Sequence, residues 1–348
     1  MKAVQVKGYG DVNQLELVER SIPDVNPDEV LIQVKACALN NTEIWMREGA
    51  YGEGSESGWK AQGVTFPRIP GSDIAGTVVN VGANVDASMQ GMDVVLFPFI
   101  SSGIQGQENQ VEDVAFLGSE HDGGYAQYVV WPAKLCYKMP LNNPIQSCVF
   151  SVSGLTAWHM CTLSNIQPHD VVMVTGANGG VGVFNVQIAA HVFKAKVIVI
   201  VGDLKHADEL EALGASEVFS YRSPNLKQEI QDSVGSVDIV LDVVGDALFA
   251  LSLEVLKIGG KLCISGSAGG QKTHLDLRKV YLKHLSILGA VLGTHEEYQD
   301  MLKAISEQRI LPIIDRTFPL EEAKEAQTYF KQSGKLGKIV LTMDEHSS

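Results

Sequence analysis

The residues with the clearest chemical potential lie where a strand-like segment runs into a series of glycines. Residues 171–175 are Val-Val-Met-Val-Thr, and the chain continues as Gly176-Ala177-Asn178-Gly179-Gly180-Val181-Gly182. Glycines here permit a tight turn and a close approach of the backbone to a ligand, and a following helix offers free N–H groups to an anion. A glycine run alone also occurs in structural turns. In its strand–turn–helix setting, the pattern predicts a dinucleotide site with the pyrophosphate on the turn.

The end of the next predicted strand, at 196–201, is where the adenosine ribose of a dinucleotide binds. An acidic residue there selects NADH, because it accepts a bond from the ribose 2′-OH and repels a 2′-phosphate. Counting back from Leu213 places that position at Val201, which favours NADPH, whereas Asp203 favours NADH. We expect NADPH, with NADH as the alternative. The expected contacts, each of which is also consistent with a solvated surface group, are Gly202, Asp203, Lys205, Tyr221 and Arg222.

A parallel sheet is needed to position these residues, and the chain from residue 145 has the pattern of one. Strand-like segments occur at 171–175, 196–201, 237–242, 261–265 and 285–291, and helical segments occur between them at 180–193, 205–213 and 247–256. Strands that are apolar on both faces and alternate with helices predict a parallel sheet covered on both sides.

The chain before residue 145 has a different pattern. Strand-like segments at 29–39, 74–81, 93–97 and 125–130 are separated by turn-rich stretches, which predicts an irregular β domain. From about 296, a helix, a strand near 313–318, a helix at 321–331 and a strand at 338–341 are expected to return to that domain. The predicted domains are therefore 1–144 with 296–348, and 145–295.

Composition excludes several classes of protein. The 348 residues carry a net charge of −14 with a pI near 5.1, which argues against nucleic acid or an anionic membrane as a partner. No apolar stretch approaches the roughly 20 residues of a membrane span, and the N-terminal residues lack a signal-peptide pattern. The five scattered cysteines form no CxxC pair, so reduced thiols in a cytoplasmic protein are expected.

Four further motifs carry a family resemblance. Residues 69–76 read IPGSDIAG, 123–129 GGYAQYV, 154–158 GLTAW and 337–341 GKIVL. Together with the glycine-rich turn and in this order, they resemble the medium-chain dehydrogenase/reductase superfamily. The resemblance implies an α/β protein with a GroES-like irregular β domain and a Rossmann doubly wound parallel sheet, with the active site between them. It also implies cofactor contacts from Thr156, Gly266, Ser267 and Lys338.

The zinc ligands of related alcohol dehydrogenases are missing. Where those enzymes carry a Cys, a His-Glu pair and a third ligand, this sequence has Asn40, Ser72-Asp73 and Val152. Segment 97–111, which matches their structural zinc loop, contains no Cys. Catalytic zinc needs three ligands from Cys, His and carboxylate, so no metal is expected.

The pattern around Asn40 is instead similar to zinc-free quinone oxidoreductases. The resemblance implies that Asn40 orients the substrate carbonyl or nicotinamide, and that Trp45 and Tyr51 line the substrate pocket. Core packing is the alternative for Trp45. Insertion 52–62 is expected to reshape the pocket mouth.

A metal-free site limits the chemistry. Simple carbonyls need polarisation, quinones need little, and enones need a few donors. We therefore expect hydride transfer from NAD(P)H to a quinone or activated enone, with Asn40 and Thr156 as catalytic residues. The alternatives are a medium-chain enoyl reductase, an alcohol dehydrogenase-like enzyme, or a low-turnover NADP(H)-binding sensor. By the same resemblance, the apolar segment 284–291 is expected to be an edge strand that pairs in a homodimer.

Overall fold

The computed structural model describes residues 1–50 and 64–343, which fall into two compact units. The first unit contains Met1–Val152, Pro312–Ser333 and the described residues from Lys338 onward, and the second contains Ser153–Leu311 and Gly334–Gly337. The expected boundary at 295/296 differs from this division, which places helix α9 (His295–Ser306) in the second unit. The reason is that α9 packs against helix α3 (Ser153–Leu163) and buries its apolar face there.

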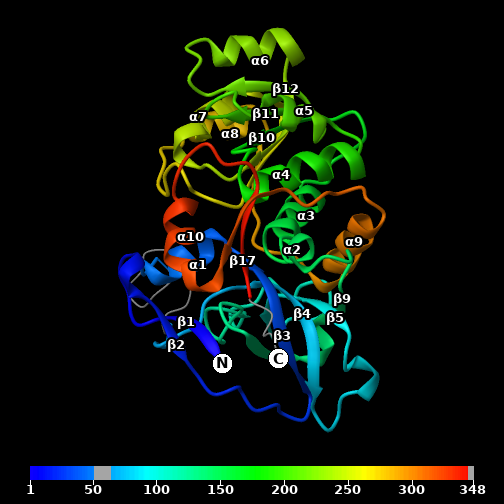
Figure 1. Cartoon of the computed structure of the whole chain (residues 1–348). Helices are drawn as coiled ribbons and strands as arrows, with labels where there is room; N and C mark the ends of the chain where they lie inside the picture. Colours follow the sequence, from blue (N-terminus) through cyan, green and yellow to red (C-terminus); the bar gives the residue numbers. More distant parts are fainter. Residues whose placement is uncertain (51–63, 344–348) are drawn as a thin grey trace. The chain divides into compact units, whose positions relative to one another are not determined.

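The first unit is built on a sheet whose described strand pairs are antiparallel except for β16 and β17, which pair in parallel. Within the described residues its order is β16-β17-β3-β4-β5-β9, and β8 also pairs with β3 (Figure 1). Strand β17 lies beside β3, so the tail does return to this unit as expected. The strands are β3 (Glu29–Ala38), β4 (Asp73–Val81), β5 (Asp93–Leu96), β8 (Tyr128–Pro132), β9 (Cys136–Lys138), β16 (Ile314–Pro319) and β17 (Lys338–Thr342).

Short elements complete this unit and account for its irregular sequence pattern. The β1–β2 and β6–β7 pairs are antiparallel. The elements are β1 (Lys2–Val6), β2 (Leu15–Glu19), β6 (Phe99–Ile100), β7 (Ala115–Phe116), α1 (Asn41–Arg47), α2 (Pro144–Ser147), α10 (Ala323–Phe330), and the 3₁₀ turns η1 (Val12–Gln14), η2 (Ala87–Met89), η3 (Ala133–Leu135) and η5 (Leu320–Glu322).

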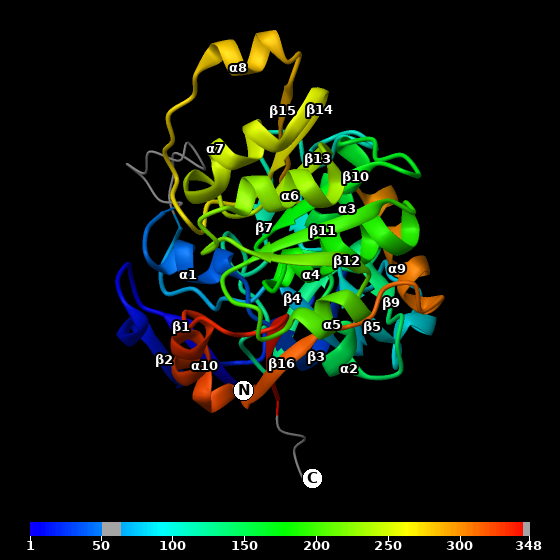
Figure 2. The same ribbon diagram turned by 90° about the horizontal axis from the view of Figure 1, so that it is seen from above.

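The second unit contains the predicted parallel sheet. Its order in the described residues is β12-β11-β10-β13-β14-β15, with α8 (Leu277–Leu282) beyond β15 in Figure 2. Three strands have the predicted bounds, whereas β14 begins earlier than expected and β12 was not predicted. The strands are β10 (Val171–Thr175), β11 (Lys196–Val201), β12 (Ala215–Ser220), β13 (Val237–Asp242), β14 (Leu256–Ile264) and β15 (Ser286–Gly289).

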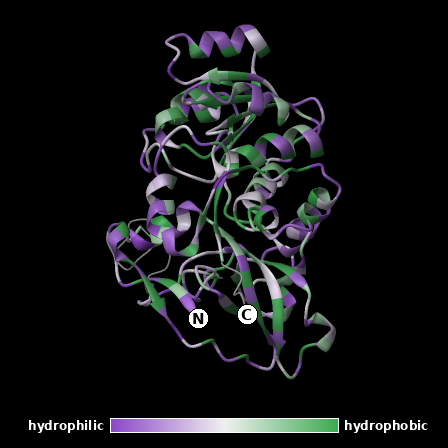
Figure 3. Cartoon of the chain, in the orientation of Figure 1, coloured by the Kyte–Doolittle hydropathy of each residue, from purple (hydrophilic) through white to green (hydrophobic). Residues whose placement is uncertain are grey.

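Helices cover both faces of this sheet, as strands that are apolar on both faces require. On one face α6 and α7 pack around Met173 and Val240, and on the other α4 follows β10 and packs against α3. Figure 3 shows hydrophilic stretches along α6, whose buried residues are Leu226 and Ile230. The remaining helices are α4 (Gly180–Gln187), the π-helical η4 (Ile188–Val192), α5 (Ala207–Ala212), α6 (Leu226–Val234) and α7 (Asp246–Val255). None of the described helices combines the length and hydropathy that a membrane span needs.

Candidate functional site

The glycine-rich turn has the geometry that the sequence predicts. Strand β10 ends at Thr175, Gly176 adopts a positive φ of 60°, and α4 begins at Gly180. A Cβ atom on Gly182 would lie 2.2 Å from the Gly176 carbonyl oxygen, so only glycine permits this approach of helix to turn. Gly179 is the N-cap residue of α4. Because it has no side chain, no side-chain hydrogen bond caps the N-terminus of this helix.

The loops at the carboxyl ends of β10, β13 and β14 contact one another. A Cβ on Gly176 would lie 2.9 Å from Val243 Cγ2, and one on Gly266 would lie 2.7 Å from the Val243 carbonyl oxygen. A Cβ on Gly245 would lie 3.2 Å from Ser267 Cα. The structure therefore brings Gly176, Gly266 and Ser267 to one edge of the sheet, which is where open α/β sheets bind ligands.

The Asp242 side chain connects the ends of β10 and β13 at this edge through hydrogen bonds. Its carboxylate is buried and accepts hydrogen bonds from Thr175 Oγ1 at 2.5 Å, Val244 N at 3.0 Å and Gly245 N at 3.1 Å. Burial raises the pKa of Asp242, while these donors lower it. All three donors come from the ends of β10 and β13, so Asp242 fixes the two loops with respect to each other.

The end of β11 carries the residues expected at the adenosine ribose. Asp203 Oδ1 accepts a hydrogen bond from Lys205 N at 3.1 Å, which closes a short turn. The ring of Tyr221 is half exposed and lies beside Gly202. A Cβ atom added to Gly202 would be 3.2 Å from Tyr221 Cε1. The Arg222 guanidinium lies 5.9 Å from the centre of that ring. Gly202, Asp203, Lys205 and Tyr221 thus share one neighbourhood in the second unit.

A second polar cluster is buried in the first unit, around Asp73. Its carboxylate accepts hydrogen bonds from Lys338 Nζ at 2.9 Å, Asn40 Nδ2 at 3.1 Å and Val152 N at 2.6 Å. Lys338 Nζ also donates to Asn40 Oδ1 at 2.5 Å. Lys338 is 1% and Asp73 0% exposed, so the ion pair is removed from water. The Lys338 ammonium therefore bonds to Asn40 and Asp73 in this structure, while its expected contact with the cofactor stays a prediction.

Glu43 adds a second carboxylate to this cluster. It accepts hydrogen bonds from Asn40 N at 2.7 Å and Ser72 N at 3.2 Å. Desolvation raises its pKa to about 7, against the opposing influence of Lys338. Burial likewise raises the pKa of the Cys37 thiol well above its usual value, with Glu43 and the Cys148 thiol contributing.

The remaining predicted residues lie in different parts of the chain. Trp45 is half-buried in α1 of the first unit, and Thr156 is buried in α3 of the second unit. Tyr51 and the whole of insertion 52–62 lie outside the described residues. All five cysteines are free, and four of them are buried, as expected.

Sequence reasoning assigned no role to Glu43 or Asp73. A signal was present for Glu43, because an Asn followed three residues later by Glu is a helix-capping pattern. Asp73 appeared only as part of a replaced His-Glu pair. Its neighbours come from positions 40, 152 and 338, which no local pattern connects.

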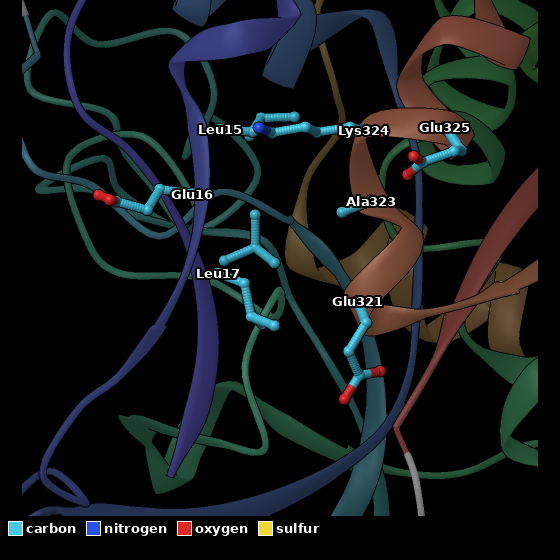
Figure 4. A pocket seen from close by; sticks show the side chains of 8 residues that line it. Leu15, Glu16, Leu17, Glu321, Ala323, Lys324 and Glu325 are labelled. Carbon is cyan, nitrogen blue, oxygen red and sulfur yellow. The ribbon is translucent and has the colours of Figure 1, made fainter.

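The first unit also has a small hollow of about 190 Å³ between β2 and the η5–α10 segment (Figure 4). Glu16 and Leu17 line it from β2, and Glu321, Lys324 and Glu325 line it from the other side. None of the predicted site residues lines this hollow. Elsewhere in residues 1–50 and 64–343, no three His, Cys, Asp or Glu side chains form a group able to hold a metal ion.

Comparison with known proteins supplies the context for these two sites. Two family models match: "Alcohol dehydrogenase GroES-like domain" over residues 26–141 and "Zinc-binding dehydrogenase" over 180–307. Human quinone oxidoreductase is 28% identical over 99% of this chain and 98% of its own. Acryloyl-coenzyme A reductase of Sulfurisphaera tokodaii is 27% identical over 98% and 99%. A structure described as an alcohol dehydrogenase from Sinorhizobium meliloti 1021 has a TM-score of 0.93 and 32% identity, covering 99% of this chain and 97% of that one.

Two glycine substitutions test the geometry of the turn. Gly182→Ala is expected to lower the free energy of unfolding by about 2–3 kcal/mol, because its Cβ overlaps the Gly176 carbonyl oxygen. Gly179→Ala is the matched control, since its Cβ would be 3.4 Å from that oxygen. It is expected to keep its stability and lose dinucleotide affinity. Urea unfolding and dinucleotide titration measure both; equal stability losses would contradict the assignment.

Glu43→Gln tests the buried carboxylate. A folded-state pKa of about 7, above the ordinary 4.5, means that Glu43 contributes most to stability below pH 4.5. That contribution falls as the pH rises through 7, by about 3 kcal/mol. The Gln variant does not titrate, so the free energy of unfolding of the wild type minus that of the variant should fall between pH 5 and pH 8. Glu112→Gln, at an exposed position, is the control; a difference independent of pH would show that Glu43 is not perturbed.

Proposed function

Because this chain belongs to the medium-chain dehydrogenase/reductase superfamily, we propose that it is an oxidoreductase that transfers hydride from NADPH to a quinone or an activated enone without a catalytic zinc ion. The observation that carries this proposal is the Asn40–Asp73–Lys338 cluster. By the resemblance, Asn40 and Asp73 stand where zinc-carrying relatives have a Cys and the Glu of a His-Glu pair, and Val152 stands at the third ligand position.

The residues of this cluster do not fit a zinc ion. Both oxygens of Asp73 already accept hydrogen bonds from N–H donors, one of them an ammonium at 2.9 Å. A divalent cation placed there would face Lys338 at close range in a site without water to screen the repulsion. Asn40, Ser72 and Val152 offer neither thiolate nor imidazole, which are the usual ligands of catalytic zinc. The raised pKa of Cys37 keeps that neighbouring thiol protonated.

The glycine-rich turn fits a dinucleotide. At Gly182 any Cβ would fill the space that allows α4 to follow the turn, and the α4 N-terminus favours a phosphate. When bound, NADPH supplies the hydride, and a quinone that receives it with one proton becomes a hydroquinone. In the second unit, Gly266 and Ser267 present backbone at the sheet edge, and we assign Thr156 a contact with the nicotinamide by resemblance.

In the first unit, the cluster orients Asn40. Its side-chain amide is held from both ends, since Nδ2 donates to Asp73 and Oδ1 accepts from Lys338. Such an amide is fixed before substrate arrives, so little reorganisation is needed during the reaction. We assign Asn40 the orientation of the acceptor carbonyl, and Trp45 and Tyr51 the walls of the pocket.

The proposed preference for NADPH over NADH rests on the residues at the end of β11. The carboxylate of Asp203 caps the backbone of Lys205, while the lysine side chain extends from the same turn. Val201, at the position where NADH-specific relatives carry an acid, is buried.

Lys205→Ala tests that preference. Loss of a charge-assisted hydrogen bond should weaken NADPH binding about tenfold. NADH affinity should change by less than a factor of about two, because NADH has no 2′-phosphate for Lys205 to contact. Dissociation constants from nicotinamide fluorescence measure both; equal losses for the two cofactors would contradict a 2′-phosphate contact.

The reaction itself is tested by following oxidation of NADPH and NADH by an ortho-quinone with a chelator present. Turnover that survives chelation and prefers NADPH is expected, since the cluster holds no zinc ligands. Activity that chelation abolishes would overturn the zinc-free proposal. An α,β-unsaturated thioester belongs in the same panel, because the relative from Sulfurisphaera tokodaii is an acryloyl-coenzyme A reductase. Thioester reduction without quinone reduction would favour the enoyl reductase, and binding without turnover would favour the cofactor sensor.

We also propose a homodimer formed through β15. This strand ends the parallel sheet, and Ile287 and Val291 are 38% and 42% exposed. Leu277, Tyr281 and Leu282 of α8 expose more apolar surface beside it. An uncovered apolar edge favours pairing with another strand.

Ile287→Asp is expected to shift the protein from dimer to monomer, because two carboxylates would face each other across the paired edge. Ile104→Asp is the matched control, as Ile104 is 70% exposed in the first unit. Sedimentation velocity separates the species. A wild-type monomer, or an Ile287→Asp dimer, would refute the interface.

A further inference from the structure

A four-residue segment between α10 and β17 lies against the cofactor turn. Gly334–Gly337 belongs to the second unit, although the chain before and after it belongs to the first. Asn178 Nδ2 donates to the Lys335 carbonyl oxygen at 3.1 Å, and Gly337 N donates to the Asn178 carbonyl oxygen at 2.9 Å. One residue of the glycine-rich turn therefore holds the segment through both its side chain and its backbone.

The other end of this segment is held at the end of β11. The Gly334 carbonyl oxygen faces His206 Nε2 at 3.2 Å and Lys205 Nζ at 3.4 Å. Residues 334–337 thus extend between the turn expected to bind the pyrophosphate and the loop expected to bind the adenosine ribose. Nothing local in the sequence of the segment indicates this position, because both of its anchors lie more than a hundred residues away.

His206 is better placed than Lys205 to hold the segment permanently. Its Nδ1 faces Glu209 Oε1 at 3.2 Å while its Nε2 faces the Gly334 carbonyl oxygen. Both partners are acceptors, so the ring can donate to one of them in either tautomer. His206 is half-buried, whereas Lys205 is exposed and holds the same carbonyl only by a long contact.

We propose that residues 334–337 form a strap that is part of the dinucleotide site, fastened by Asn178 at the glycine-rich turn and by His206 at the ribose end, so that Lys205 is released to bind the cofactor's 2′-phosphate. Asn178 and His206 are positioning residues for the adenosine diphosphate half of the cofactor. The proposal rests on the proposed use of NADPH and not on the identity of the acceptor.

The proposed strap predicts different losses of cofactor affinity for substitutions at neighbouring residues. Releasing it by Asn178→Ala or by His206→Ala should weaken NADPH and NADH binding alike, by about fivefold to tenfold, since both cofactors share the adenosine diphosphate half. Lys205→Ala should affect NADPH alone. Gly334→Ala is a third route, because Gly334 has a φ of 81° that strains any other residue.

The experiment measures dissociation constants of NADPH, NADH and adenosine 2′,5′-bisphosphate for the full-length protein by calorimetry. Hydrogen exchange of residues 333–337 and the melting temperature are followed in parallel. The strap variants should exchange faster in this segment and lose affinity for all three probes with little change in melting temperature. His274→Ala, at an exposed histidine of the same unit, should match the wild type.

Three results would overturn the strap. These are unchanged affinities in both Asn178→Ala and His206→Ala, losses confined to the two probes that carry a 2′-phosphate, or a wild type that binds none of the probes. Failure of quinone reduction with these binding effects intact would instead refute the proposed reaction and leave the strap standing. The two failures are therefore distinguishable.

Discussion

The first unit depends on how the buried carboxylate of Asp73 is satisfied. A charge with no exposure is tolerated only when donors replace the water it has lost. Those donors come from the loop after β3, from the start of β17 and from the backbone of Val152. Because these segments are distant in sequence, the carboxylate is satisfied only when β3, β4 and β17 are all in register. The same requirement fixes Asn40, so one electrostatic constraint serves both the sheet and the candidate site.

Asp242 is also a buried carboxylate, but its hydrogen-bond donors are of a different kind. It lies in the core of the second unit and is satisfied by one hydroxyl and two backbone N–H groups without any cation. Neutral donors are sufficient there because the loop after β13 presents two N–H groups to the carboxylate, and Thr175 at the end of β10 adds its hydroxyl. Asp73 has a lysine partner instead, so removing either charge of that pair would leave the other uncompensated in the core.

The sequence predicted the parts of the structure that local patterns determine. Strands 171–175, 196–201 and 237–242 were predictable because their residues are apolar on both faces. Strand β12 was missed because Ala215–Ser220 has neither strict alternation nor an apolar run longer than Val218-Phe219, as its place at an edge of the sheet allows. The strand expected at 125–130 begins three residues later, since Tyr125 N donates to Pro70 in the loop before β4 and Gln127 N donates to Lys2 in β1. The Asp73 cluster required tertiary contacts that no single segment encodes.

The position of β17 has a consequence for how the protein is made. This strand lies between β16 and β3, yet the continuous stretch Ser153–Leu311 of the second unit is translated between β3 and β17. Nearly all of the second unit is one continuous stretch, so its sheet can form while the remainder is still being translated. The first unit must instead keep part of one edge of β3 open until β17 has been synthesised. During that interval β3 presents unpaired backbone groups, which makes the nascent first unit the part of the chain with the greatest need for a chaperone.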